Sequence, residues 1–274
     1  KDDDENFSVA KEIFENVEDA LSFKLSKLIF EGPSEELNLT INTQPALMAT
    51  SIAILKVIAQ ESGKPINQLC NYTAGHSLGE YTALCASNAL SVEDTARLLQ
   101  LRGKSMQEAS PKGQGAMAAC LCEIANDNVD GQIVISGHVE VVDRIIATMK
   151  DTGLKAIKLN VSAPFHCSLI ENAKLPMSEA LGKCDFRTPI IPIIQNVSAE
   201  PETDINNITK NIISQITNRV RWRETMEKFS ELQVTELVEI GSGRVLSGLA
   251  KRSKLDFKIN NFEKIADLAK ISQL

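Results

Sequence analysis

A serine flanked by glycines, between a short apolar segment and a helix, constrains this sequence more than any other feature. The pattern Gly75-His76-Ser77-Leu78-Gly79 follows segment 70–74 and precedes a predicted helix that runs to about residue 86. At a strand–turn–helix corner of this kind the tight turn brings the backbone close to neighbouring backbone, and a Cβ at the glycines would clash. The serine hydroxyl then lies at a helix N-terminus, which favours developing negative charge. The pattern indicates a nucleophilic serine, and the alternative is a chance match at an ordinary corner.

A serine nucleophile needs a general base, and the sequence offers three histidines. His76 adjoins the serine on a sharp turn, so we expect its ring to point away and to be structural. His138 follows a glycine at the end of a predicted strand, where a solvated or capping histidine is typical. Elimination favours His166, although a histidine after Phe165 is more often a packing residue when taken alone.

One arginine lies on or beside the apolar stripe of a predicted helix over residues 91–109. The stripe consists of Val92, Thr95, Ala96, Leu99, Gly103 and Met106. Arg102 cannot lose its proton there, so its guanidinium needs an anion. An internal ion pair with a nearby glutamate and a bidentate bond to a substrate carboxylate both satisfy that need, and the pattern does not choose between them.

Composition excludes several classes of function. The chain has 274 residues, 43% of them hydrophobic, and a net charge of −7, which argues against nucleic acid or an anionic membrane as the main partner. The longest apolar stretch, residues 46–59, is interrupted by Lys56 and has helical periodicity, so no membrane span is expected. The six cysteines form no C-x-x-C pair, which favours reduced thiols in a cytoplasmic protein without a metal site.

Helical and strand patterns alternate along the chain, which predicts an α/β class with a small α+β unit inserted between the two larger parts. Ten residues separate Leu121 from Gln132, fewer than a parallel crossover with a helix needs, so either this insert is small or residues are absent there. Helices are expected at 8–22, from Thr43 to Gly63, and at 91–109, 139–150, 168–182, 204–216 and 222–232; strands are expected at 116–121, 133–136, 155–161, 190–197 and 236–240.

Several stretches spread over almost the whole chain occur in the order of one enzyme family. Together they resemble the bacterial malonyl-CoA:acyl-carrier-protein transacylases of type II fatty-acid synthesis. Any one stretch would be weak, but the ordered set is highly specific. The matching segments are residues 43–47, 74–81, 102–109, 115–119, 164–167, 239–241 and 245–249.

The resemblance implies an α/β fold made of two subdomains. Residues 1–112 and 163–274 would form a large α/β-hydrolase-like subdomain, and residues 113–162 a small ferredoxin-like subdomain, incomplete near 121–123. The family begins with a strand and a Gly-Gln-Gly-Ser-Gln segment whose first glutamine completes the oxyanion hole, and this sequence starts just after that point. A family helix is also missing between Leu121 and Gln132. We expect both to be residues absent from this sequence rather than true deletions.

The resemblance also assigns catalytic roles. Ser77 would be the nucleophile and His166 its base. The backbone carbonyl of Gln215, in place of an aspartate, would orient the histidine. The backbone N–H of Leu78 would donate to the oxyanion.

Substrate-binding roles follow from the same resemblance. Arg102 would hold the free carboxylate of the malonyl group. Phe165, with Leu78, fits the malonyl-selective members. Asn126 and Asn128 match an Asn-x-Asn element close to the family's active site.

The implied reaction is ping-pong transfer of malonyl from malonyl-CoA to the phosphopantetheine thiol of holo acyl carrier protein, with a malonyl-serine intermediate and no cofactor. Acyl carrier protein is acidic, so docking needs a local positive patch. The candidate patch consists of Arg244, Lys251, Arg252 and Lys254, and a plain solvated helix face is the alternative.

Three other functions compete with this interpretation: a related acyltransferase with another acyl group, a serine thioesterase or hydrolase, and a non-catalytic carrier-protein scaffold. A hydrolase triad would need an acid between Ser77 and His166. The available aspartates all lie in the inserted unit and are poor candidates: Asp127, Asp130, Asp143 and Asp151. Asp130, Arg219 and Ser242 stand where the family commonly has proline, and we have no functional account of them.

Overall fold

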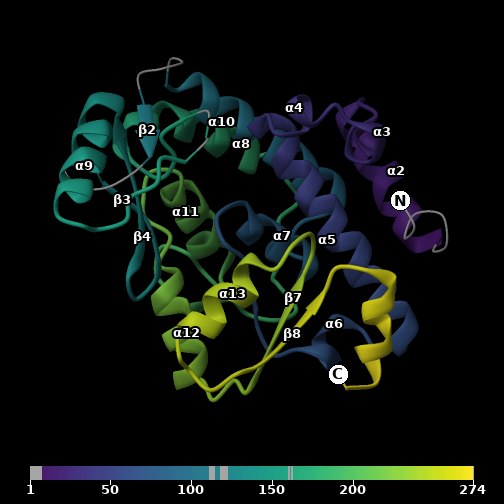
Figure 1. Cartoon of the computed structure of the whole chain (residues 1–274). Coiled ribbons are helices and arrows are strands. Elements are labelled where there is room, and N and C mark those ends of the chain that lie inside the picture. The colour runs from purple at the N-terminus through teal and green to yellow at the C-terminus, as the bar shows by residue number, and fades with distance from the viewer. Residues whose placement is uncertain (1–7, 111–114, 118–122, 160, 162, 274) are drawn as a thin grey trace.

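The computed structural model describes residues 8–110, 115–117, 123–159, 161 and 163–273. It is a mixed α/β structure, rich in helices, with small sheets (Figure 1). One described sheet has the order β1-β5-β6, with β1 (Thr73–Ala74) parallel to β5 (Ile193–Ile194) and β6 (Pro201–Glu202) antiparallel to β5. In another, β7 (Glu236–Ile240) runs parallel to β8 (Lys258–Phe262). The predicted strand over 190–197 is therefore reduced to two residues, and β8 was not expected.

Helices from the N-terminal part enclose the main core. Helix α5 (Thr40–Ser62) packs against α2 (Ser8–Leu21), α7 (Leu78–Ala86) and α8 (Val92–Glu108). Their buried faces contribute Val17, Met48, Ile52, Leu84 and Leu99. The short helices α3 (Leu25–Glu31), α4 (Ser34–Leu37) and α6 (Ile66–Leu69) connect these elements. Ser91 caps α8, because its side chain accepts a hydrogen bond from the Asp94 N–H.

Helix α5 begins earlier than the sequence indicated. The helix was expected from Thr43, but it starts at Thr40, after Leu39. The Thr43 hydroxyl bonds instead to the carbonyl oxygens of Leu37 and Leu39, so it serves the preceding turn. The end is as predicted, because Gly63 caps the helix with a φ of 65°.

Helix α5 is also the one described helix long and apolar enough to cross a membrane. Of its apolar 18-residue window, 56% is buried inside the protein. A helix that is mostly buried against other helices passes this test as a core element, so the match is weak evidence for a membrane span.

The inserted unit differs from the prediction in two strands. Its sheet has the antiparallel order β2-β4-β3, with β2 at Gly115–Met117, β4 at Gln132–His138 and β3 at Glu123–Val129. Strand β3 was not predicted, and it turns directly into β4 through Asp130-Gly131, so no crossover helix is needed between residues 123 and 132. The expectation of missing residues between Leu121 and Glu123 lies outside the described part of the chain.

The strand expected at 155–161 is wrong for the described residues of that segment. They follow α9 (Val139–Asp151) without regular structure, although apolar and polar residues alternate. The alternation reflects no buried face, because Ile157 and Leu159 are 62% and 40% exposed. Figure 1 places α9, β2, β3 and β4 together at one end of the molecule, away from α2 and α3.

Helices of the C-terminal half form a second hydrophobic core next to β5. Trp222 and Phe229 of α12 (Trp222–Glu231) form a second core with Leu249 of α13 (Val245–Arg252). The helix expected at 168–182 is split into a 3-10 helix η1 (Ser168–Ala173) and α10 (Lys174–Leu181), and α11 (Ile205–Gln215) follows close to its predicted range.

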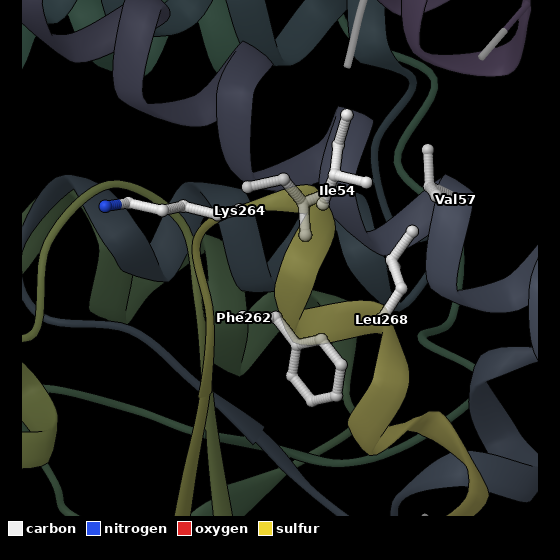
Figure 2. Close-up of a pocket in the computed structure, with 6 residues that line it drawn as sticks. Ile54, Val57, Phe262, Lys264 and Leu268 are labelled. Carbon is white, nitrogen blue, oxygen red and sulfur yellow. The ribbon is translucent and has the colours of Figure 1, made fainter. Parts of the chain in front are cut away.

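The last segment folds back onto the long helix α5. Phe262 of β8 and Leu268 of η2 (Ile265–Gln273) line a small apolar pocket with Ile54 and Val57 of α5, while the Lys264 side chain points away from this apolar group (Figure 2). This packing joins the C-terminal sheet to the N-terminal helices.

Candidate active site

Ser77 lies at a strained corner between β1 and α7. Its φ and ψ are 54° and −110°, an unfavourable region for a residue with a side chain. A Cβ on Gly75 would lie 2.0 Å from the backbone carbon and oxygen of Gly79, so only glycine fits at position 75. A Cβ on Gly79 itself would meet open space. The close approach predicted for both glycines therefore restricts Gly75 alone.

The structure brings the serine, histidine and glutamine of the sequence prediction together. Ser77 Oγ lies 2.7 Å from His166 Nε2, and His166 Nδ1 lies 2.8 Å from the backbone oxygen of Gln215. Because a carbonyl oxygen can only accept, Nδ1 carries the proton and Nε2 is free to accept one from the serine. Such an arrangement can activate a hydroxyl without a carboxylate as orienting group.

His166 is buried and neutral in this setting. Burial, followed by the positive charge of Arg102, lowers the pKa of His166 to about 3. The backbone at His166 is in the left-handed region, with φ 58°, which indicates a second strained position at the site. A neutral imidazole beside Ser77 is the form that a general base requires.

Arg102 lies directly against the serine and is only 2% exposed. Its Nη2 donates to Ser77 Oγ at 3.0 Å and to Gln215 Oε1 at 2.9 Å, and its Nη1 donates to Gln44 Oε1 at 2.8 Å. All three acceptors are neutral oxygens. The internal ion pair, one of the two alternatives for this arginine, is not among its described contacts, and buried Glu80 interacts with the guanidinium through its charge without a described hydrogen bond. The guanidinium can therefore still bind an anionic group beside Ser77 directly.

Two side-chain amides hydrogen-bond to the backbone of the Ser77 corner, and one carboxylate hydrogen-bonds to this pair of residues. Gln215 Nε2 donates to the Ser77 carbonyl at 3.0 Å and to Glu80, while Asn196 accepts from the Ser77 N–H at 2.7 Å. Glu80 is fully buried, and burial raises its pKa to about 7 despite the opposing hydrogen bonds from Gln215 and Asn196. The proposed nucleophile is thus surrounded by groups with fixed orientation.

The chain is similar to known proteins along most of its length. The profile of the Acyl transferase domain matches residues 7–252. The chain belongs to the acyl transferase domain family. It is 42% identical to the malonyl CoA-acyl carrier protein transacylase of Bacillus subtilis strain 168, over 90% of this chain and 83% of the relative. The same-named protein of Escherichia coli K12 is 39% identical, over 90% of this chain and 85% of the relative.

Solved structures agree with the sequence relatives. An acyl-carrier-protein-S-malonyltransferase from Bartonella henselae superposes with a TM-score of 0.94 at 44% identity, covering 98% of this chain and 92% of that one. A malonyl-transacylase in complex with its acyl carrier protein, from a type II polyketide system, gives a TM-score of 0.91 at 37% identity, covering 98% and 93%. The mixed α/β fold is therefore that of this acyl transferase family.

Among the other predicted site residues of this acyl transferase, some contact the corner and some do not. Leu78 is the first residue of α7, where backbone N–H groups have no acceptor inside the helix. Phe165 is partly buried against the main core. Asn128 Oδ1 lies 2.8 Å from His76 Nε2, whereas buried Asn126 is joined to Val220 by a backbone bridge. Neither asparagine is brought to Ser77 or Arg102 by a described hydrogen bond.

The other two histidines, and the three residues that stand where the family commonly has proline, lie away from the Ser77 hydroxyl in the described contacts. The His76 ring lies 5.5 Å from that of Trp222 and contacts Asn128, as expected for a structural residue, and exposed His138 precedes α9. Asp130 forms the β3–β4 turn, and Arg219 donates to Glu224 at 2.8 Å. Ser242 lies between two glycines with positive φ, and nothing in the structure explains its choice.

The predicted basic patch is exposed but partly engaged. Arg244, Lys251, Arg252 and Lys254 are all accessible around α13. Arg252 donates to Gln132 at 2.8 Å, and Arg244 lies 3.8 Å from Glu263. Among the described residues, no three His, Cys, Asp or Glu side chains group together in a way that could hold a metal ion.

Sequence reasoning assigned no role to three residues that the structure places around Ser77. Gln44 accepts from Arg102, Glu80 from Gln215, and Asn196 bridges the corner. Gln44 and Glu80 lie within quoted family stretches, so their motifs could have drawn attention to them. Asn196 lies in no such stretch, and only the fold brings it to the serine.

Proposed function

We propose that this protein transfers the malonyl group of malonyl-CoA to the phosphopantetheine thiol of acyl carrier protein through a malonyl-serine intermediate. One observation carries the proposal: a buried guanidinium with neutral partners donates a hydrogen bond to the same Ser77 oxygen that contacts His166. Such a site combines a nucleophile with a binding group for an acyl chain that ends in a carboxylate. The names of the sequence relatives support this substrate.

In the first half-reaction His166 Nε2 takes the Ser77 proton as Oγ attacks the thioester carbonyl. The carbonyl oxygen becomes an oxyanion and accepts from the Leu78 N–H. When the intermediate collapses, the carbon–sulfur bond breaks, and the coenzyme A sulfur leaves with the proton from His166. In the second half, the carrier thiol gives its proton to His166 and attacks the malonyl-serine, and Ser77 recovers its proton as it leaves.

Arg102 selects the acyl group in this proposal. A malonyl carboxylate beside Ser77 can form two parallel hydrogen bonds with the guanidinium, which a lysine cannot reproduce. An acetyl group has no such anion and would leave the charge unpaired. A related acyltransferase with an uncharged acyl group, the nearest alternative, gives no reason to bury this arginine against the nucleophile.

The hydrolase alternative is less well supported. Its triad would have a carboxylate on His166 Nδ1, whereas the partner there is the Gln215 carbonyl. Asp127, one of the aspartates considered for that role, forms a two-pronged ion pair with Arg223 on α12. The presence of Ser77, His166 and Arg102 in mutual contact likewise speaks against a non-catalytic scaffold.

The finer arrangement of the fold is also part of the proposal. Residues 1–112 and 163–274 would form the α/β-hydrolase-like subdomain, with a ferredoxin-like unit at 113–162. The antiparallel β2-β4-β3 sheet with α9 supports a separate small unit. Hydrogen bonds of Ala125 and Asp127 with Val220 would join it to the larger body.

For the partner, α13 and its basic patch at Arg244, Lys251, Arg252 and Lys254 remain the proposed docking surface for an acidic carrier protein in the cytoplasm. The relative solved with its acyl carrier protein supports the class of partner. A transfer assay tests the function: holo acyl carrier protein is incubated with enzyme and either malonyl-CoA or acetyl-CoA, and the mass of the carrier is followed. We expect fast formation of malonyl carrier and little acetyl carrier. Equal rates, or release of free malonate without carrier product, would overturn the proposal.

A further inference from the structure

The backbone on both sides of Ser77 is held by a single side chain from another part of the fold. Asn196 follows β5 and is fully buried. Its Nδ2 donates to the Gly75 carbonyl at 2.8 Å, and its Oδ1 accepts from the Ser77 N–H at 2.7 Å. Because the first group can only accept and the second can only donate, the orientation of the carboxamide is determined by its partners.

These two bonds act where the backbone is strained. The φ of 54° and ψ of −110° at Ser77 are costly for a residue with a Cβ, so the corner needs contacts that stabilise this conformation over a relaxed one. The buried Gly75 carbonyl and the partly buried Ser77 N–H would also lose their described partner if the amide were removed. The Asn196 carboxamide satisfies both requirements at once.

A second amide completes the restraint and gives it a catalytic consequence. Gln215 Nε2 donates to the Ser77 carbonyl at 3.0 Å and to Asn196 Oδ1 at 3.2 Å. In a trans peptide the carbonyl and the following N–H point in opposite directions. Holding the Ser77 carbonyl towards Gln215 therefore turns the Leu78 N–H the other way, to the side proposed for the oxyanion.

Glu80 fixes this pair of amides in turn. One carboxylate oxygen accepts from the Asn196 backbone N–H at 3.3 Å, and the other accepts from Gln215 Nε2. The network is buried and contacts the Ser77 backbone, while Arg102 and His166 contact its hydroxyl. Backbone and hydroxyl are thus held by different sets of residues.

From this geometry we propose that Asn196 is a positioning residue for acyl transfer, which holds the Gly75–Ser77 backbone so that Ser77 Oγ faces His166 and the Leu78 N–H faces the oxyanion. That the reaction is acyl transfer rests on the proposed function, whereas the positioning role rests on the hydrogen bonds alone. Asn196 touches neither Ser77 Oγ nor Arg102 in the described contacts, so its loss should slow the chemistry more than it weakens substrate binding.

The test compares Asn196→Ala and Asn196→Ser with Asn211→Ala, which removes a nearby amide that bonds to Gln195 and not to the corner. Each folded variant is treated with a fluorophosphonate probe, and labelling of Ser77 is followed by intact mass. Since small displacements of reacting groups cost up to about 100-fold, we expect labelling and kcat to fall about 10- to 100-fold in both Asn196 variants. The KM for malonyl-CoA should change less than about threefold, because Arg102 keeps its described contacts.

Thermal denaturation identifies any variant that is unfolded at the assay temperature, and the serine variant, which retains a polar group, is the substitute if alanine is not tolerated. If a folded Asn196 variant is labelled as fast as Asn211→Ala and has the same kcat, the positioning role is overturned. Labelling needs no malonyl group or carrier. Slow labelling in an Asn196 variant, with a parent that transfers no malonyl, would therefore support positioning and refute the proposed function.

Discussion

Arg102 Nη2 and His166 Nε2 both contact the same oxygen atom, Ser77 Oγ, at 3.0 and 2.7 Å. In the proposed function the imidazole removes the serine proton, and the guanidinium lies within hydrogen-bond distance of the oxygen to which the acyl group would be attached. Gln44 and Gln215 accept the other described hydrogen bonds of the arginine without neutralising it. The proposed nucleophile and the proposed carboxylate-binding group therefore belong to one hydrogen-bonded group.

Removing the guanidinium should change which acyl group is used. A charge-assisted bidentate pair is worth up to about 3 kcal/mol, so Arg102→Ala should lower kcat/KM for malonyl-CoA about 100-fold. Acetyl-CoA has no carboxylate to lose, and its kcat/KM should stay the same or rise. Arg97→Ala, on the exposed side of the same helix, is the control and should leave both values unchanged. An equal loss for both substrates would contradict the assigned role of Arg102.

Arg102 should also determine the pH dependence of the serine. The pKa of His166 is lowered to about 3, first by burial and then by the Arg102 charge, with His76 a further contributor. In the parent, labelling of Ser77 by a fluorophosphonate should show no inflection at the ordinary histidine pKa of about 6.5. In Arg102→Met a repulsive positive charge is gone, so the acid limb should move upwards, towards that value. Because the Glu80 carboxyl has a pKa of about 7, the same profile is measured in Glu80→Gln. An inflection near 6.5 that persists there and is unchanged by Arg102→Met would count against this arrangement.

Buried Glu80 should make the stability of the protein depend on pH. Its pKa is raised from 4.5 to about 7, chiefly by burial, so the folded state prefers the protonated carboxyl. Its contribution is fully present below about pH 4.5 and is lost as pH rises through 7. Relative to the parent, Glu80→Gln should therefore gain stability between pH 5 and pH 8, by at most about 3 kcal/mol.

Thermal denaturation across this pH range measures the effect. The difference in Tm between Glu80→Gln and the parent should become more positive with rising pH, even if lost hydrogen bonds lower the Tm of the variant at every pH. Glu61→Gln, at an exposed position of α5, is the matched control. A difference that is constant over the whole range would show that Glu80 does not titrate differently in the folded and unfolded protein.

Substitution by alanine should affect the stability of the protein very differently at the two glycines of the corner. At Gly75 the new Cβ would lie 2.0 Å from the Gly79 backbone, which must move, and we expect a loss above about 4 kcal/mol or no folded protein. At Gly79 the Cβ would enter open space in the first turn of α7, so Gly79→Ala should fold with near-parental stability. Urea unfolding midpoints compare the two. A stable, active Gly75→Ala protein would mean that the corner is not packed as described.

Local signals were enough to predict several parts of the site. Glycine spacing indicated the corner at Ser77, and helical periodicity placed Arg102 on an apolar face. The pairing of His166 with Gln215 came from the family resemblance, since nothing in the local sequence connects residues 49 positions apart. Asn196 contacts residues 119 and 121 positions away, and no periodicity encodes such a contact.

Strand β3 was missed for a related reason. Its residues Asn126, Asp127 and Asn128 are polar, and polar side chains argue against a buried strand. They are buried because distant groups satisfy them, including Arg223 for Asp127 and His76 for Asn128. Conversely, residues 155–161 alternate like a strand, yet the described part of that segment pairs with no sheet.

The most direct measurement is the intact mass of the protein after brief exposure to malonyl-CoA, beside Ser77→Ala, before and after addition of holo acyl carrier protein. We expect a malonyl adduct on the parent alone, stable towards water and transferred to the carrier when it is added. An adduct on both proteins, or one that water removes without the carrier, would contradict a malonyl-Ser77 intermediate in acyl transfer.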